Sequence, residues 1–352
     1  MCVVCCGYNG SAVACCGLSP IMSTILNHAS GSGDPATSLS ALWAYVQPAL
    51  DHIVKSPSND PNGKAPAIDF GLYTGIHSAC YNYFTSAQHE AMSLDASDDR
   101  AAARGKDIYA RLDKYFEEVA RELTLGAPLD DITLIQYLVP SFNRYHAGAF
   151  AANRLLNYVN RHYVKRAMDE DNGWFRMADV LKAMGPDEQE HRFNITKRYQ
   201  EKKLEELQQW GYKEGDSSEQ LAFAESCAEA GSPLDRVVPV ASTAHRRFRT
   251  EFLEPLLATP KIKGTTRTKN KIPKAPTTPN PARPKGRLAR AIHELLETDA
   301  VGPEERLRLA RDLAKALQVT GVKEDHPLRK KLDKFLASSI SPIPPSDTTL
   351  RS

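Results

Sequence analysis

Apolar residues recur at intervals of three and four positions along most of the chain, which is the spacing of one face of an α-helix. The first such stripe begins near Ser38 and ends in the polar cluster at 56–63. Further stripes cover about 68–88, 105–125 and 132–138. We find no run of alternating β-branched residues that would indicate a strand. The pattern therefore predicts an all-α fold.

Pro140 stands where it could open a separate helix, because the missing N–H of proline is harmless in a first helical turn. The stripe after Pro140 continues to about Met168 and ends at the acidic run 169–173. Helical patterns also occupy the segment from 174 to 235, the segment from 245 to 257 and the segment after 286. These patterns cover about 197–212, 217–230, 245–257, 288–296, 307–317 and 328–336.

Composition separates these helical parts from polar segments. Residues 1–37, rich in Cys, Gly and Ser, and residues 341–352 are predicted to be disordered tails. Residues 259–287 carry many prolines and basic residues and are predicted to be a linker or a long loop. The helical domain then covers 38–258, and we keep open whether the helices of 288–340 complete it.

Charge and hydropathy narrow the classes of function. The formal net charge is +2, with 45 Lys and Arg against 43 Asp and Glu, so the chain as a whole has no general attraction for nucleic acid. No apolar run approaches the roughly 18–20 residues that cross a bilayer. We therefore expect a protein without a membrane span, located in the cytoplasm, the nucleus or both.

Five of the seven cysteines crowd the first sixteen residues. S-palmitoylation and metal binding are two hypotheses for this cluster. Neither has support nearby, because no amphipathic or apolar helix adjoins the cluster and no second Cys/His pair stands at zinc-ligand spacing. We favour a tail of reduced thiols.

Motifs for the common catalytic chemistries are absent from the sequence. There is no P-loop, no G-x-G-x-x-G, no G-x-S-x-G elbow and no H-E-x-x-H. His77, His146 and His162 fall within helical patterns among aromatic and aliphatic neighbours, which favours packing or interface roles. We expect no enzyme activity, no catalytic residue, no cofactor and no metal ligand.

Two stretches resemble the adaptor-binding N-terminal repeat of the cullin family. One is 155–166, whose centre reads Y-V-N-R-H-Y-V, and the other is 72–77, which reads L-Y-T-G-I-H. Segments 43–53, 108–112 and 249–256 add weaker similarity. The resemblance covers about 38–172, and 238–300 more loosely, with a helical insertion at 174–237. It implies a cullin-repeat-like helical bundle or solenoid of five or more helices, and nothing after residue 258 resembles the C-terminal cullin homology domain.

The resemblance also implies a function and a surface. Cullins are scaffolds of ubiquitin ligases, and their first repeat holds a BTB/POZ-fold (Skp-type) adaptor, sometimes with an F-box-type substrate receptor, against its second and fifth helices. A chain without the RING-binding part would act as a regulator or decoy of such adaptors. Asp69 and Phe70 are weaker candidates for the surface, and core packing is the alternative for its apolar members. The residues expected to face the adaptor are Leu72, Tyr73, Ile76, His77, Phe150, Asn153, Tyr158 and Arg161.

A second hypothesis is association with nucleic acid or a nuclear role through the basic segment 261–287. Its lysines and arginines could neutralise phosphates or act as an import signal. The segment contains no aromatic residue to stack on bases, so we favour a solvated linker and do not expect nucleic acid as a partner.

Overall fold

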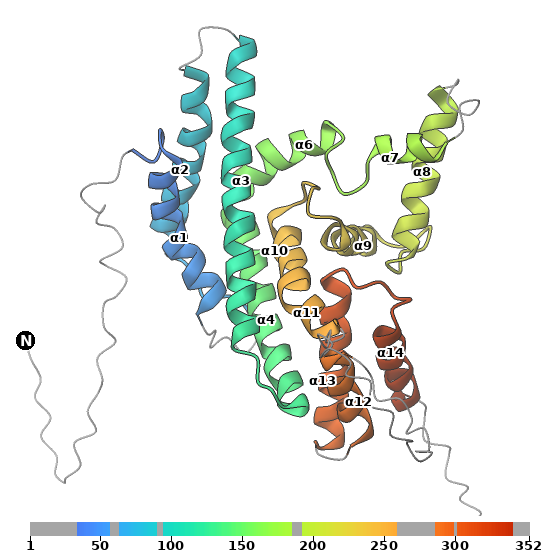
Figure 1. The fold of residues 1–352 in the computed structure, drawn as a ribbon. Helices are drawn as coiled ribbons and strands as arrows, with labels where there is room; N and C mark the ends of the chain where they lie inside the picture. Colours follow the sequence, from blue (N-terminus) through green and yellow to red (C-terminus); the bar gives the residue numbers. More distant parts are fainter. Residues whose placement is uncertain are drawn as a thin grey trace, which may run out of the picture.

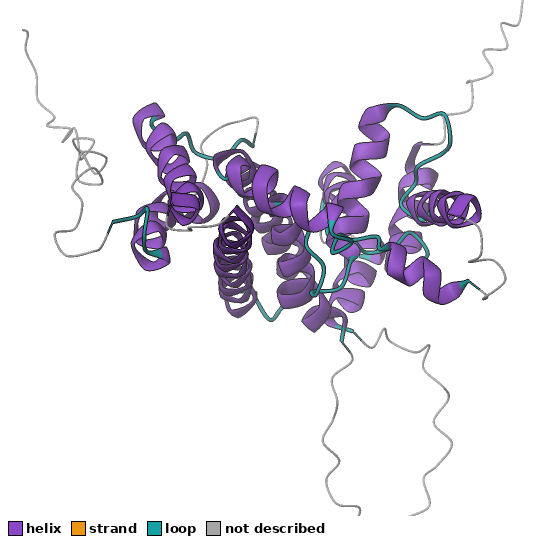
Figure 2. Ribbon diagram, turned by 90° about the horizontal axis from the view of Figure 1, so that it is seen from above, coloured by secondary structure: helices purple, strands orange, loops and turns teal. Residues whose placement is uncertain are grey.

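The computed structural model describes residues 34–56, 63–89, 94–184, 192–258, 286–298 and 301–340. Every regular element in these ranges is a helix (Figure 2), which confirms the all-α prediction. Among the described helices, none has the length and apolar character needed to cross a bilayer. Residues 1–33 of the predicted tail 1–37, the predicted tail 341–352 and residues 259–285 of the basic segment 259–287 lie outside the described residues.

The first helices begin at side-chain caps. Helix α1 (Leu39–Lys55) starts at Ser38, whose side chain accepts a hydrogen bond from the Ala41 amide. Helix α2 (Phe70–His89) starts after Asp69, whose Oδ2 accepts hydrogen bonds from the amides of Gly71 and Leu72 at 2.8 and 3.2 Å. Each cap satisfies backbone donors that have no partner within the helix.

Helix α3 (Leu94–Leu125) begins earlier than the predicted start near residue 105. Residues 94–104 carry no apolar stripe, but they are rich in alanine and arginine, which have high helix propensity. The helix therefore extends beyond the part that its apolar stripe marks.

Helix α4 (Asp131–Leu155) contains Pro140 in its interior, so the predicted separate helix starting at Pro140 is wrong. Proline removes one backbone hydrogen bond within a helix. The neighbours Val139 and Phe142 are each 1% exposed, and their packing in the core holds the helix continuous through the proline.

Helix α4 also ends earlier than the predicted end near Met168. Leu156, with φ −102° and ψ 28°, interrupts it. The chain continues as α5 (Asn157–Val159), the π-helical turn η2 (Asn160–Val164) and α6 (Lys165–Asp169). The predicted uninterrupted stripe to Met168 therefore bends at Leu156.

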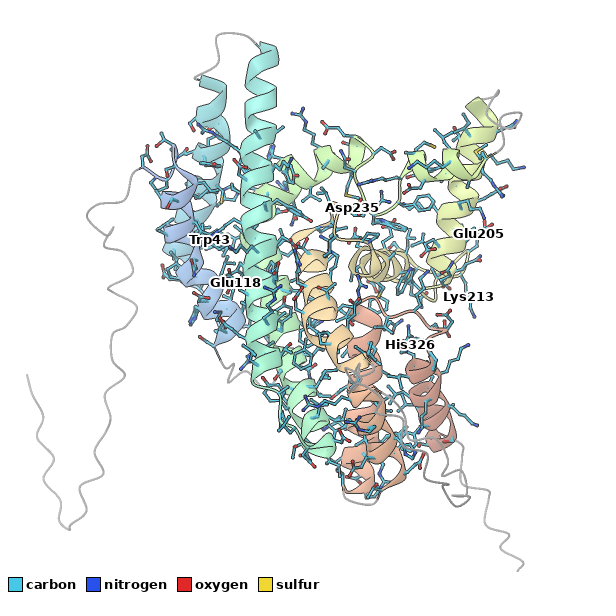
Figure 3. The ribbon with its side chains drawn as sticks, viewed as in Figure 1. Trp43, Glu118, Glu205, Lys213, Asp235 and His326 are labelled. Carbon is cyan, nitrogen blue, oxygen red and sulfur yellow. The ribbon has the colours of Figure 1, made fainter. Side chains whose placement is uncertain are left out.

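The segment that sequence patterns mark as an insertion forms α7 (Met177–Ala183), α8 (Arg192–Gln208) and α9 (Ser218–Gly231). Helix α9 packs against α10 and α13 (Figure 1). Asp235, labelled in Figure 3, follows α9 and forms an ion pair with Arg176 at 3.4 Å. A small core of its own joins α8 and α9, formed by Leu207, Trp210, Ala224, Cys227 and Ala228.

The remaining helices follow α9 along the chain (Figure 1). They are α10 (Val240–Phe248), the π-helical turn η4 (Arg249–Leu253), α11 (Glu254–Leu257), α12 (Arg287–Glu297), α13 (Pro303–Val319) and α14 (Pro327–Ile340). Helices α1, α10, α12 and α13 all pack against α4. One apolar core runs from α1 to α14.

Close packing and buried hydroxyl groups fix the helices around α4. A Cβ atom at Gly148 would lie 2.8 Å from the Ile53 carbonyl oxygen, so α1 can approach α4 only because this residue is glycine. The Tyr145 hydroxyl donates to the Ala244 carbonyl at 2.9 Å and ties α4 to α10. Trp43, labelled in Figure 3, contacts the Tyr115 ring of α3 with centroids 5.9 Å apart.

Candidate functional site: an aromatic surface on α2 and α5

Helix α2 has two uncharged faces. Its 20 residues include no Asp, Glu, Lys or Arg. One face lies in the core, while the other exposes Phe70 (78%), Tyr81 (49%), Tyr73 (37%) and His77. A solvated helix face normally carries charged residues, whereas protein interfaces are depleted in charge and enriched in aromatic residues. The outer face of α2 therefore has the composition of an interface.

Tyr158 of α5 extends this surface beyond α2. Its ring meets the rings of His77 and Tyr81 edge-on, each with a centroid distance of 5.8 Å. His162 of η2 stacks on the ring of Tyr158, with a centroid distance of 4.1 Å and an interplanar angle of 25°. Partial burial and the nearby charge of Arg161 lower the pKa of His162, so this imidazole is neutral near pH 7. We call Phe70, Tyr73, His77, Tyr81, Tyr158 and His162 the aromatic face.

Two arginines lie beside the aromatic face. The Tyr73 hydroxyl donates to the backbone carbonyl of Arg154 at 3.3 Å, which places the end of α4 against α2. Arg161 lies next to His162 in η2. Both arginine side chains are exposed. The exposed surface thus combines aromatic rings with guanidinium groups, the residue types that most often carry binding energy at interfaces.

Leu72 and Ile76 do not belong to this exposed surface. Their exposures are 8% and 0%, and both lie in the main core. They occupy the inner face of α2, since positions four apart on a helix share one side. Leu72 and Ile76 were expected to face an adaptor, but they pack in the core, which was the alternative given for the apolar positions.

Asn153 has a structural role within the chain. Its Oδ1 accepts hydrogen bonds from Asn160 Nδ2 at 2.9 Å and from the Ala241 amide at 3.2 Å. The Oδ1 of Asn160 accepts from the Val240 amide at 3.0 Å. Residue 239 at the start of α10 is a proline, which offers no side-chain cap. The two asparagines supply the caps that α10 lacks.

Sequence reasoning missed Asn160. Its only signal was Pro239, because a helix that begins at a proline must find its caps elsewhere. The sequence gives no sign that the caps lie on η2 and α4.

Phe150 lies among residues of α4 and α10. Its ring is 45% exposed and meets the rings of His146 and His245 at 4.8 and 5.8 Å. His146 Nδ1 and His245 Nε2 are 2.9 Å apart. Burial lowers the pKa of His146 to about 4, helped by the charge of Lys315, and lowers that of His245 well below 6.5. Both imidazoles are neutral near pH 7.

Eight residues were expected to face the adaptor, and the structure brings four of them together on one exposed surface. Tyr73, His77, Tyr158 and Arg161 lie on or beside the aromatic face, and Tyr81 and His162 join them. Of the weaker candidates, Phe70 is the most exposed ring of α2, and Asp69 caps the helix. Phe150 and Asn153 contact α10 instead.

No group of three or more His, Cys, Asp or Glu in the described ranges is arranged to hold a metal ion. Cys80 and Cys227 are buried free thiols, and burial raises the pKa of each to about 12.

Comparison with known proteins adds to this geometry. Cell division control protein 53 of Saccharomyces cerevisiae is 24% identical to the chain over 136 residues, which cover 36% of the chain and 16% of that protein. Cullin-1 of Caenorhabditis elegans is 24% identical over 141 residues, which cover 37% of the chain and 17% of that protein. The chain is cullin-like over about a third of its length.

The cullin-like relationship is partial. The chain spans only 16% and 17% of the lengths of the two relatives. No family model matches the chain, and no solved structure gives a significant match. The similarity is therefore limited to about a third of the chain.

Proposed function

We propose that this cullin-like chain is a non-catalytic scaffold that binds a BTB/POZ-fold (Skp-type) adaptor of ubiquitin ligases through the aromatic face. The observation that carries the proposal is the outer side of α2, which exposes Phe70, Tyr73 and Tyr81 on a helix without a charged side chain. Large exposed apolar patches on folded proteins mark interaction sites. The similarity to cullins supports an adaptor as the partner.

The surface is preformed for binding. Tyr158 contacts the rings of His77, Tyr81 and His162, so its ring loses little freedom when a partner covers it. Rigid aromatic side chains give large contact areas at low entropic cost, and this favours a stable complex.

Binding of the purified chain to Skp-type adaptors tests the proposal. The probes are the purified adaptors of Saccharomyces cerevisiae and Caenorhabditis elegans, with affinity measured by calorimetry. We expect the wild type to bind at least one of them and the double variant Tyr73→Ala/Tyr81→Ala to bind roughly tenfold or more weakly. Circular dichroism checks that the variant is folded.

Phe223→Ala is the matched control, because Phe223 lies on α9 and is 39% exposed, close to the 37% of Tyr73. This variant should bind like the wild type. Failure of the wild type to bind either adaptor, or equal binding by the double variant, would contradict the proposal.

Two roles are compatible with an adaptor-binding scaffold. It can act as a ligase subunit, or it can act as a decoy that occupies adaptors. Adding the chain in excess to a reconstituted cullin ligase separates them, because a decoy lowers substrate ubiquitination in proportion to the adaptor it removes. The nucleic-acid hypothesis concerns residues 259–285, which are outside the described ranges, and no contact of the described residues favours it.

A further inference from the structure

The charged residues on η2 and in the last turn of α4, beside the aromatic face, are basic. Neither α2 nor the segment 157–164 contains an Asp or Glu. The carboxylate nearest in sequence is Asp69, whose Oδ2 accepts hydrogen bonds from the amides of Gly71 and Leu72. Arg154 and Arg161 are exposed, and neither has an ion-pair partner among the described residues. Among the described residues of α2, α5, η2 and the last turn of α4, the charged side chains are therefore arginines.

The two arginines belong to the side of the face formed by α4 and η2. Tyr73 Oη bonds to the Arg154 carbonyl, and Arg161 adjoins His162, which stacks on Tyr158. Phe70, Tyr73 and Tyr81 on α2 provide the uncharged side. The face is thus divided into a neutral aromatic side on α2 and a cationic edge at the α4–α5 junction.

We propose that the partner covering this face presents carboxylates along one edge, opposite Arg154 and Arg161, and an uncharged apolar surface over α2. A guanidinium that is covered without a carboxylate loses its hydration and gains no compensating partner. Arginine pairs with carboxylates through two parallel hydrogen bonds, which also sets the orientation of the partner. The inference rests on the proposed function and adds the chemistry and the orientation of the bound protein.

Affinity at two salt concentrations tests the acidic edge. The chain is titrated with the same two Skp-type adaptors in about 50 and about 300 mM NaCl, because added salt screens exposed charge pairs. We expect wild-type affinity to fall by roughly tenfold between the two conditions. Arg154→Gln/Arg161→Gln should bind more weakly at low salt and lose most of that salt dependence.

Charge reversal gives the sharper result. Arg161→Glu should weaken binding by about tenfold or more, because it places like charges opposite each other. Arg311→Glu is the control, since Arg311 is exposed on α13 and carries the same change of charge away from the face. An adaptor in which an acidic surface residue is changed to Lys should restore binding to Arg161→Glu, whereas it should bind Arg311→Glu as weakly as it binds the wild type.

The outcomes separate this inference from the proposed function. A wild type that binds with an affinity insensitive to salt and to Arg161→Glu overturns the acidic edge and leaves adaptor binding intact. A wild type that binds neither adaptor overturns both. Loss of affinity in Arg161→Glu, with Arg311→Glu unchanged and the reversed adaptor restoring binding, supports the acidic edge.

Discussion

The side-chain oxygen of Asn160 accepts a hydrogen bond from the backbone amide of Val240 at 3.0 Å, which connects the π-helical turn beside the aromatic face to the first turn of α10. The Asn160 amide group also donates to the Oδ1 of Asn153 at 2.9 Å, across the interruption at Leu156. One residue therefore fixes the position of η2 against α4 and caps α10. Tyr158 and Arg161 owe their placement to this arrangement.

Asn160→Ala should destabilise the protein by about 1–2 kcal/mol, the usual effect of removing a helix cap. The Val240 amide would lose its acceptor, and Asn153 would lose a donor. Urea denaturation followed by circular dichroism measures the change. Asn143→Ala is the control, because Asn143 is exposed on α4, and it should change stability by less than about 0.5 kcal/mol. Equal stabilities of the two variants would refute the capping role.

Glu229 should make stability fall as the pH rises. Burial raises its pKa from 4.5 to about 7, although Ser242 donates a 2.6 Å hydrogen bond to it and the charges of Arg246 and Lys203 oppose the shift. Because the folded-state pKa lies above the unfolded value, the protonated form favours folding. This stability is complete below about pH 4.5 and is lost as the pH rises to about 7.

The variant Glu229→Gln isolates this contribution. It keeps an oxygen for Ser242 but cannot ionise, so the wild type should lose on the order of 3 kcal/mol relative to the variant between pH 4.5 and pH 7. Denaturation curves across this range measure the difference. Glu219→Gln, at the exposed start of α9, should follow the wild type. A constant difference between wild type and Glu229→Gln would show that Glu229 is charged in the fold.

The His146–His245 pair should produce the opposite trend. Burial depresses both pKa values, that of His146 to about 4, so stability is complete above the unfolded value of 6.5 and is lost as the pH falls toward 4. His146→Gln removes one of the two groups and should reduce the loss between pH 6.5 and pH 4 by on the order of 3 kcal/mol. His77→Gln, on the exposed face of α2, serves as the control. NMR titration of the imidazole Cε1–H signals checks the assignment, and protonation of His146 above pH 6 would contradict it.

The two faces of α2 should separate stability from binding. Ile76→Ala should cost about 2–5 kcal/mol, because Ile76 is 0% exposed and its removal leaves a cavity. Phe70→Ala should change stability by less than about 0.5 kcal/mol, since Phe70 is 78% exposed, yet it should weaken adaptor binding. Thermal melts and calorimetric titrations of the same two variants test both statements. A destabilised Phe70→Ala variant would mean that the exposed ring packs against the fold.

Helix positions were largely predictable from local pattern, whereas their ends and joins were not. The apolar stripes predicted α1, α2 and the helices after α11 to within a few residues. Pro140 misled because proline most often opens a helix, and the tertiary packing of Val139 and Phe142 overrides that local preference. The bend at Leu156 carries no local signal, because the bonds that hold it come from Asn160 and from α10.

The candidate surface was predictable only in part. Residues 72–77 and 155–166 pointed to α2 and α5, and the absence of charge from α2 is visible in the sequence. The sequence does not show which side of α2 faces outward. Leu72 and Ile76 were therefore expected on the surface, although they lie in the core. The apolar periodicity of a helix shows that it has two different faces, but the packing of neighbouring helices decides which face is buried.

The sequence by itself determined that this chain is helical, where its apolar stripes run and which stretches are cullin-like. These properties depend on residues close together in the chain. Only the tertiary structure decided that Asn153 and Asn160 cap α10, that His146 meets His245 and that Tyr158 contacts both His77 and His162. The capping of α10 and the His146–His245 contact both join residues of α4 or η2 to residues of α10. Such long-range hydrogen bonds depend on how whole helices pack, and no local sequence pattern encodes that packing.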